Sequence, residues 1–247
     1  MFGILTSCID TIDVDVPNGG ARLVVEASIN WEKGTTGATQ IIKLSESTAF
    51  FSPNVNVPVT GAYVKVTNDE NGMHFIFNDQ NNGDYIATDF IPQLNKSYTL
   101  EIRYNGEVYT ANETLMPVST INTVEQKTLE NGLEEEIIQL RVFFDDPAGI
   151  ENYYLGEFID LNLSSLSLVA ISDEFTDGNE SFIEYYDENI IISKGKEIAI
   201  NIYGISENYF NYISLLIEQG SITGPFTTIP VQLKGNCINS NNPNEEV

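Results

Sequence analysis

Residues that catalysis and nucleic-acid binding commonly depend on are scarce in this 247-residue sequence. It has one histidine, two cysteines, and 11 Lys and Arg residues against 36 Asp and Glu, giving a net charge of −25. So few cations argue against nucleic acid as a partner, because its phosphates must be neutralised. They also argue against a chain that lies flat on an anionic leaflet. No apolar run reaches the roughly 18 residues of a membrane-spanning helix, so none is predicted.

The lone histidine limits the enzyme classes open to the chain. His74 would have to serve any Ser-His-Asp or Cys-His nucleophile system. It alternates with the apolar residues of Met73–Phe77, which favours a surface or cross-strand histidine instead. No zinc-ligand spacing, nucleophile elbow or phosphate-binding glycine loop is present. A hydrolase that uses two carboxylates stays an alternative, although no pair stands out. The sequence therefore predicts a protein that is not an enzyme.

What is present is strand-forming sequence. Hydrophobic residues make up 42% of the chain and aromatic residues 11%, which indicates a globular protein. Short alternating segments recur up to Pro117, and the last two form a hairpin about Asn105-Gly106, a strong hairpin signal. Strands are predicted here at 21–30, 40–44, 63–67, 73–77, 84–90, 96–104 and 107–114.

The chain beyond Pro117 carries more acid. Residues 118–247 have 22 acidic and 5 basic residues, against 14 and 6 in residues 1–117. The polar stretch Ser119–Gly132 is interpreted as a boundary or crossing segment. Strands are predicted at 137–144, 152–160, 197–205 and 226–233, with another apolar stretch at 161–171.

One segment has helical period instead. Residues 206–219 begin with Ser206 as a helix cap and end before Gly220. Tyr209, Tyr212, Ile213, Leu216 and Ile217 fall on one face. We predict a mainly β fold of two β-sandwich domains, immunoglobulin- or transthyretin-like, with this helix packed on the second. The domains are 21–117 and 118–247.

The tetrapeptide Leu5-Thr6-Ser7-Cys8 has the pattern of a bacterial lipoprotein signal. In that interpretation Cys8 is lipidated and residues 1–20 are a clipped signal followed by an acidic tether, since only seven uncharged residues precede Cys8. The alternative is a chance match in an N-terminal strand. Cys237 is then interpreted as a buried small hydrophobic residue, with a Cys8–Cys237 disulfide as the second choice.

Two acidic loops are candidate calcium sites. Residues 173–180 supply the four carboxylates of Asp173, Glu174, Asp177 and Glu180, and residues 78–84 are a sparser candidate. For both, the alternative is a loop rich in good turn formers. A platform on which a glycan could stack is suggested by three aromatic pairs, Phe50-Phe51, Tyr153-Tyr154 and Tyr185-Tyr186. Neighbouring residues of a strand point to opposite faces, however, so one residue of each pair is expected in the core.

An ordered set of segments resembles a family of Bacteroidota outer-membrane lipoproteins that carry a domain of unknown function of the DUF4249 type. The segments are Cys8 with the acids that follow it, Ala21–Ile29, Leu44-Ser45 with Phe50-Phe51, Val59–Val64, Gly83–Tyr85, Tyr98–Ile102, Tyr109–Ala111, Phe144–Pro147 with Asn152–Tyr154, Gly235–Asn239 and Asn242-Pro243. The resemblance covers essentially the whole chain, and the family usually continues beyond the Asn-Pro.

The resemblance implies a non-catalytic lipoprotein, facing the cell exterior, that serves as an accessory subunit of a TonB-dependent outer-membrane transport or assembly complex. Its expected partner is a TonB-dependent barrel, and Cys8 is the one functional residue that carries over. The alternative function is a glycan- or peptide-binding module at the cell surface. No cofactor is expected, apart from the calcium candidates.

Overall fold

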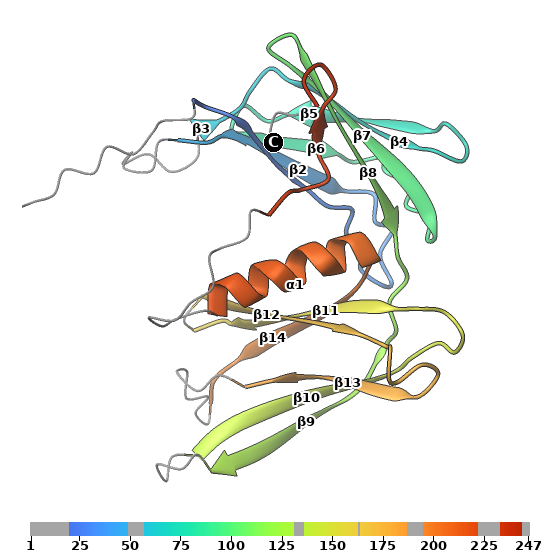
Figure 1. Cartoon of the computed structure of the whole chain (residues 1–247), viewed down its shortest axis with the longest axis vertical. Coiled ribbons are helices and arrows are strands. Elements are labelled where there is room, and N and C mark those ends of the chain that lie inside the picture. The colour runs from blue at the N-terminus through green and yellow to red at the C-terminus, as the bar shows by residue number, and fades with distance from the viewer. Residues whose placement is uncertain are drawn as a thin grey trace, which may run out of the picture.

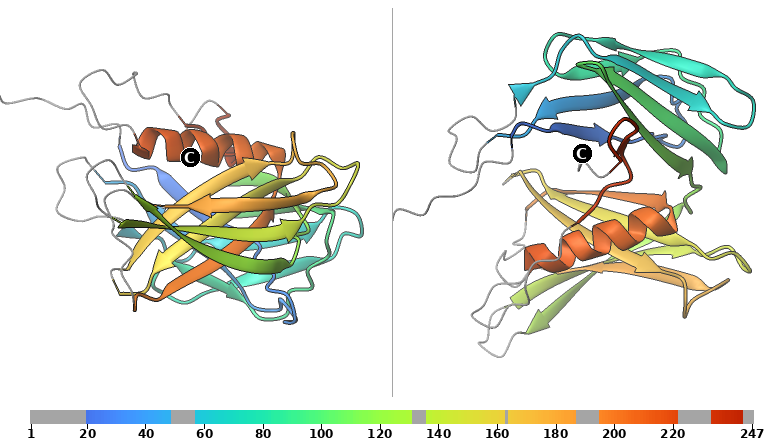
Figure 2. Two further views of the ribbon diagram at one scale, coloured as in Figure 1. Left: turned by 90° about the horizontal axis from the view of Figure 1, so that it is seen from below. Right: turned by 45° about the horizontal axis from the view of Figure 1, so that its top comes forward.

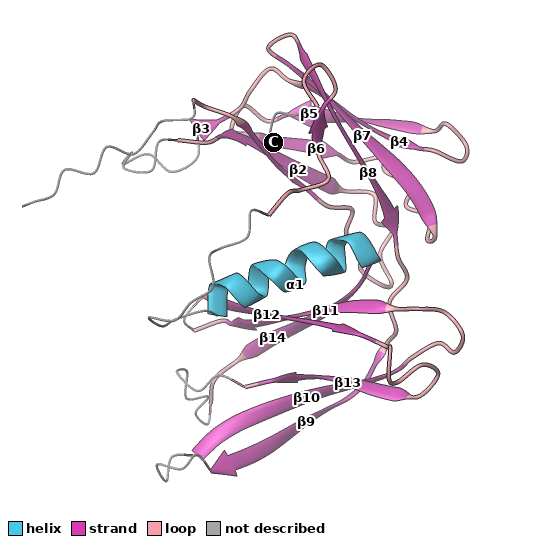
Figure 3. Cartoon of the chain, in the orientation of Figure 1, coloured by secondary structure: helices cyan, strands magenta, loops and turns pink. Residues whose placement is uncertain are grey.

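A computed structural model describes residues 20–48, 57–130, 136–162, 164–186, 195–221 and 233–243. The chain is mainly β, with antiparallel sheets and one described helix (Figure 3). The elements are β1 (Leu23–Ala27), β2 (Gln40–Glu46), β3 (Val57–Pro58), β4 (Tyr63–Asn68), β5 (His74–Asp79), β6 (Asp84–Ala87), β7 (Lys96–Tyr104), β8 (Glu107–Leu115), β9 (Ile121–Glu130), β10 (Glu136–Asp145), β11 (Tyr153–Asp160), β12 (Ser165–Ser172), β13 (Glu180–Tyr185), β14 (Ile198–Ile205), α1 (Glu207–Ser221) and β15 (Ile238–Asn239).

Nine strands make one curled sheet, here called the first region. Its order is β1-β2-β6-β5-β4-β7-β8-β15, with β3 beside β2. Strand β5 pairs with β4 through residues 74–77 and with β6 through 78–79, so the sheet turns where β5 changes neighbours. Alternation buries Ile42 and Leu44 while Ile41 and Lys43 face outward. The buried apolar side chains of β1, β2 and β4 to β8 form one cluster, which includes the ring of Phe90, 4.4 Å from that of Phe75.

The hairpin predicted about Asn105-Gly106 is confirmed. Both residues have positive φ, 51° and 82°, as its two-residue turn requires. It joins β7 to β8 in continuous register from Lys96↔Leu115 to Tyr104↔Glu107.

Two three-stranded sheets and the helix form the second region. Sheet β13-β10-β9 faces sheet β12-β11-β14, and Val142, Phe144, Phe158 and Ile183 are buried between them. Helix α1 packs on the other face of the β12-β11-β14 sheet, where Ile213 meets Leu155 and Ile205. Figure 1 shows the layers in order, with α1 on the side of its sheet nearer the first region.

The helix is confirmed, but its packing face is turned from the predicted one. Tyr212, Ile213 and Ile217 of the predicted face pack on the sheet together with Phe210, whereas Tyr209 and Leu216 are 40% and 41% exposed. The ring of Phe210 lies 4.9 Å from that of Tyr153, which places this residue of the N-terminal turn against the sheet. The side chain of Ser206 accepts a hydrogen bond from the Tyr209 amide, as its predicted cap role requires.

The polar stretch Ser119–Gly132, interpreted as a boundary or crossing segment, follows the passage of the chain from one region to the other, but residues 121–130 within it form strand β9. Most of its side chains are exposed, since β9 is an edge strand, so it lacks the apolar alternation that marks a buried strand. Strands β3, β13 and β15 were also missed, β3 and β15 because each has only two residues. The strand predicted at 226–233 lies almost entirely outside the described residues.

Among the described elements, the chain passes between the two regions twice, after β8 and after α1. Between β8 and β9 the chain passes so closely over β14 that a Cβ atom on Gly204 would overlap the carbonyl group of Pro117. Near the end of the chain, β15 returns to the first sheet and pairs with β8, Ile238 opposite Thr110 and Asn239 opposite Tyr109. Figure 2 shows this return. Within the described part of the chain, no helix has the length and apolarity needed to cross a bilayer.

Candidate functional site

Two loops lie side by side at one end of the second region. The first, residues 146–152, joins β10 to β11, and the second, residues 173–179, joins β12 to β13. Each loop therefore passes from one three-stranded sheet to the other. We call them the clasped loops, because backbone hydrogen bonds tie them together: the Asp146 amide donates to the Asn179 carbonyl (3.0 Å), and the Asp173 amide to the Asn152 carbonyl (3.1 Å).

Three carboxylates gather between the clasped loops. One oxygen from each of Asp146, Asp173 and Asp177 lies within 4.8 Å of the others. Asp146 and Asp173 are only 6% and 4% exposed, whereas Asp177 is exposed. Of the four sequence candidates, the structure thus brings Asp173 and Asp177 together. Glu174 and Glu180 are exposed and do not belong to this group of three.

Asp146 is the member that sequence reasoning missed. Asp146 is not among the sequence candidates, because nothing in the local pattern pairs it with Asp173 and Asp177. The one feature of the sequence that points to Asp146 is its position directly before Pro147 in a turn, where an Asp side chain commonly accepts hydrogen bonds from backbone amides of the loop.

The carboxylates accept hydrogen bonds from the protein itself. Asp146 accepts from the Tyr154 hydroxyl (2.7 Å) and the Gly178 amide (3.1 Å). The amide of Asn152 donates to Asp173 at 2.9 Å. The amide of Gly149 donates to Asp177 at 2.7 Å. These bonds make the cluster a structural clasp, since each carboxylate holds the opposite loop or a strand beneath it.

The charge of the cluster affects its titration. Burial raises the pKa of the Asp173 carboxyl, and the negative charges of Asp146 and Asp177 raise it further, partly offset by the hydrogen bond from the Asn152 amide. Burial and the bond to Asp146 likewise raise the pKa of Tyr154. Calcium requires six to eight oxygen ligands. The three carboxylates supply part of such a set, and a calcium ion would compete with the four donors that they already accept.

The other calcium candidate, residues 78–84, is a hairpin turn. Asp79 accepts hydrogen bonds from the amides of Gly61 (2.6 Å) and Asn81 (2.7 Å), and Asn82 bonds to Asp84. These bonds shape the turn between β5 and β6 and leave its two carboxylates outside any group of three among the described residues.

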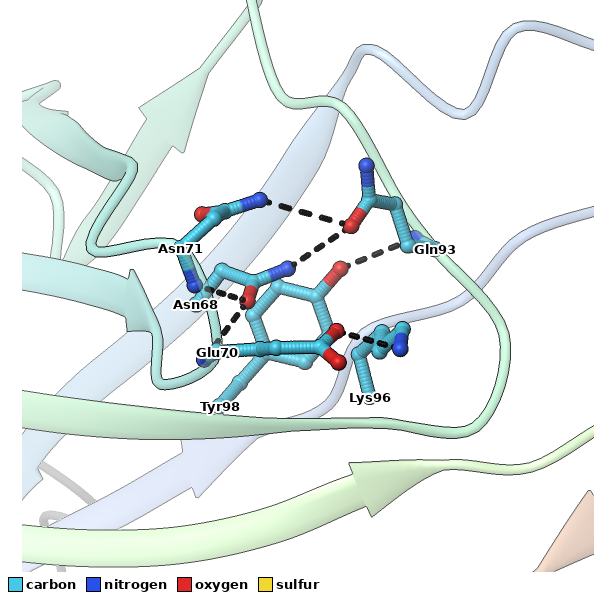
Figure 4. Close-up of polar contacts among 6 residues, drawn as sticks. All are labelled: Asn68, Glu70, Asn71, Gln93, Lys96 and Tyr98. Carbon is cyan, nitrogen blue, oxygen red and sulfur yellow. Dashed lines mark hydrogen bonds and ion pairs between the residues drawn. The ribbon is translucent and has the colours of Figure 1, made fainter.

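A network of amides supports a second turn of the first region (Figure 4). Buried Asn68 accepts from the Glu70 amide (3.0 Å) and donates to the side chain of Gln93 (3.1 Å). The Gln93 amide donates to the Tyr98 hydroxyl at 2.8 Å, and Lys96 pairs with Glu70. The network ties the turn between β4 and β5 to the segment before β7, which is a structural role.

The structure places the remaining candidates as follows. His74 is exposed at the start of β5, as a surface histidine would be. Cys237 is a half-buried free thiol against the core of the first region, and burial raises its pKa to about 11. Such a thiol is unreactive at neutral pH. Cys8 and Phe50-Phe51 lie outside the described residues.

The aromatic pairs in the second region are largely core. Tyr154 and Tyr185 are buried, and Tyr185 stacks on Phe158 at 4.6 Å. Tyr153, on the opposite face from Tyr154, is covered by the helix through Phe210. Only Tyr186, 48% exposed, remains open to solvent. These two pairs do not form a platform on which a sugar could stack.

The fold and the clasped loops thus define a mainly β protein whose best-formed polar cluster ties together two loops. The chain belongs to the family described as a domain of unknown function (DUF4249), whose model matches residues 9–247. Neither a curated protein nor a solved structure matches it.

Proposed function

We propose that this protein is a non-catalytic lipoprotein of the Bacteroidota cell surface and an accessory subunit of a TonB-dependent outer-membrane transport or assembly complex. The family resemblance, now joined by the family match, supports this proposal. The observation that carries it is the position of the match. The family model begins to match at residue 9, immediately after Cys8, which would be the first residue of the mature lipoprotein.

The proposed anchor is an acylated Cys8, with residues 9–20 as an acidic tether. Acyl chains bind the membrane through buried methylene groups, and two or more give durable anchoring. We also propose that each region is a β-sandwich domain of the immunoglobulin or transthyretin kind. The clustering of β10, β13, β11 and β14 around one apolar core supports this for the second region.

The test is purification of the native full-length protein from its own membranes in mild detergent. We expect a TonB-dependent barrel to co-purify, and the mass of the mature N-terminus to include acyl chains on Cys8. The variant Cys8→Ser should be released from the membrane fraction, while Cys237→Ser should stay there as the matched control. A solitary protein with an unmodified Cys8 would refute the proposal.

A further inference from the structure

The clasped loops expose apolar side chains at their tips. Phe175, in the second loop, is 91% exposed, the highest value of any large apolar residue that the structure describes. Ile150, in the first loop, follows at 62%. An isolated exposed apolar residue is ordinary, but an aromatic ring almost wholly in water is an unfavourable arrangement that contact with another surface would relieve.

Both tips are held in place by bonds on either side. In the second loop, the Thr176 amide donates to the Asp173 carbonyl at 2.7 Å, directly across Phe175. In the first, Ile150 lies between Gly149 and Asn152, whose amides donate to Asp177 and Asp173. The loops also touch, since a Cβ atom on Gly178 would lie 2.7 Å from the Cβ of Ala148. A preordered loop loses little entropy on binding, and an aromatic side chain on such a loop is typical of a binding hot spot.

The surroundings of the tips are entirely acidic. Residues 145–152 and 173–180 contain seven Asp and Glu residues and no Lys or Arg. Five of the seven are exposed, namely Asp145, Glu151, Glu174, Asp177 and Glu180. A surface that accepts Phe175 must therefore tolerate this charge, and cationic side chains around an apolar pocket would complement it. An anionic lipid surface would repel it.

We propose that Phe175 and Ile150 form a docking site that inserts into an apolar pocket, rimmed by Lys and Arg, on a protein partner. The inference rests on the proposed function in that an accessory subunit needs such a surface. The docking site goes beyond that function because it specifies the surface of this molecule that contacts the partner and the kind of side chains on the partner's surface.

The first experiment uses photocrosslinking in living cells. A benzophenone amino acid replaces Phe175 in the full-length protein, and the matched control carries it at Leu161, 55% exposed at the opposite end of β11. We expect a protein adduct at position 175 that is absent at 161. Mass spectrometry of the adduct should locate it in an apolar segment flanked by Lys or Arg. No adduct above the control, or an adduct to lipid, would overturn the docking site.

The second experiment measures recovery of the adduct partner with Phe175→Ser/Ile150→Ser, against the control Leu161→Ser/Leu166→Ser. We expect recovery to fall at least about tenfold for the tip variant and to stay unchanged for the control. The variant Glu174→Gln/Glu180→Gln should lower recovery of the partner by a smaller factor. The difference in recovery between this variant and the wild type should become smaller at high salt. Equal recovery for the tip variant and the wild type would refute the inference.

The identity of the partner separates this inference from the proposed function. A TonB-dependent barrel in the adduct supports both. A different protein with the expected basic, apolar site supports the docking site and refutes the proposed function. Recovery of the barrel with no adduct at position 175 supports the proposed function and refutes the docking site. Sedimentation of the wild type with vesicles of phosphatidylethanolamine and phosphatidylglycerol, lost in the tip variant, would show a membrane contact and refute the docking site too.

Discussion

The two regions of the molecule bury different kinds of polar group. In the first region the buried polar side chains are the amides of Gln40, Asn68 and Asn239. In the second they include the carboxylates of Asp146, Asp160 and Asp173. A neutral amide needs only hydrogen bonds, but a buried carboxylate must also be compensated for its lost hydration or shift its pKa. The second region should therefore depend more on pH and on single contacts.

The arrangement of the apolar core differs as well. The first region surrounds one continuous cluster with a single curled sheet. The second divides its apolar residues between two layers, one between the sheets and one beneath the helix. Each of these two clusters has fewer buried residues than the single cluster of the first region, so the loss of one side chain removes a larger share of its packing.

The largest expected effect comes from Gly204→Ala, which tests the junction between the regions. The added Cβ would overlap the Pro117 backbone, so β14 or the segment between β8 and β9 must move. We expect a loss of about 3 kcal/mol or more in the free energy of unfolding, measured by urea denaturation. The control Gly220→Ala places a Cβ in open space in the helix and should gain about 0.5–1 kcal/mol. Equal midpoints for Gly204→Ala and the wild type would contradict this contact.

The next effect concerns the buried charge of the second region. Lys196 is paired with Asp160 at 3.1 Å, and Asp160 is 3% exposed, so Lys196→Met removes a cation that interacts with a buried carboxylate. We expect a loss of about 2–3 kcal/mol. In the first region, Arg103→Met removes a partner of Glu101 from a site where Arg103 is 62% exposed, and should cost less than about 1 kcal/mol. Similar losses in the two variants would remove the contrast between the regions.

A smaller effect is a pH response of opposite sign in the two regions. The pKa of Asp173 is raised, so its ionisation costs stability, and this cost grows as pH rises from the unfolded pKa through the folded one. The pKa of Glu101 is lowered, first by the hydrogen bond from Lys65, so its stabilisation is present above the unfolded pKa and is lost as pH falls through the folded one.

Relative to the wild type, Asp173→Asn should gain stability as pH rises, and Glu101→Gln should lose it. Urea midpoints between about pH 3 and pH 7 measure both. Differences of the same sign for the two variants would show that the local environments do not control the response.

The smallest expected effect is that of calcium. Because the clasp carboxylates already accept four hydrogen bonds from the protein, about 1 mM calcium should give no heat and no change in melting temperature. Asp177→Asn should behave as the wild type in this titration. A calcium-dependent rise in melting temperature that Asp177→Asn abolishes would instead assign the cluster as a metal site.

Much of the fold was predictable where local pattern and tertiary position agree. The alternation in Gln40–Glu46 and the Asn105-Gly106 turn identified their elements, since each requires information from only a few residues. Strand β9 was not predictable in this way, because an edge strand exposes most of its side chains and resembles a polar loop. The site was half predictable. Asp173 and Asp177 are near one another in the sequence. Asp146 comes close to them only because two loops that connect the same two sheets lie side by side.

The return of β15 to the first region has a consequence for the order of folding. Strand β8 pairs with β7 on one side, and on the other its Val108 carbonyl accepts from the Ser240 amide at 2.7 Å. Strand β7 and Ser240 lie more than 120 residues apart in the sequence, so this border of the first sheet stays open until residues 238–240 have been synthesised. An open border can pair with another chain and so promotes aggregation. The C-terminal segment thus acts as a late closure, and premature truncation before Asn239 should yield a molecule prone to self-association.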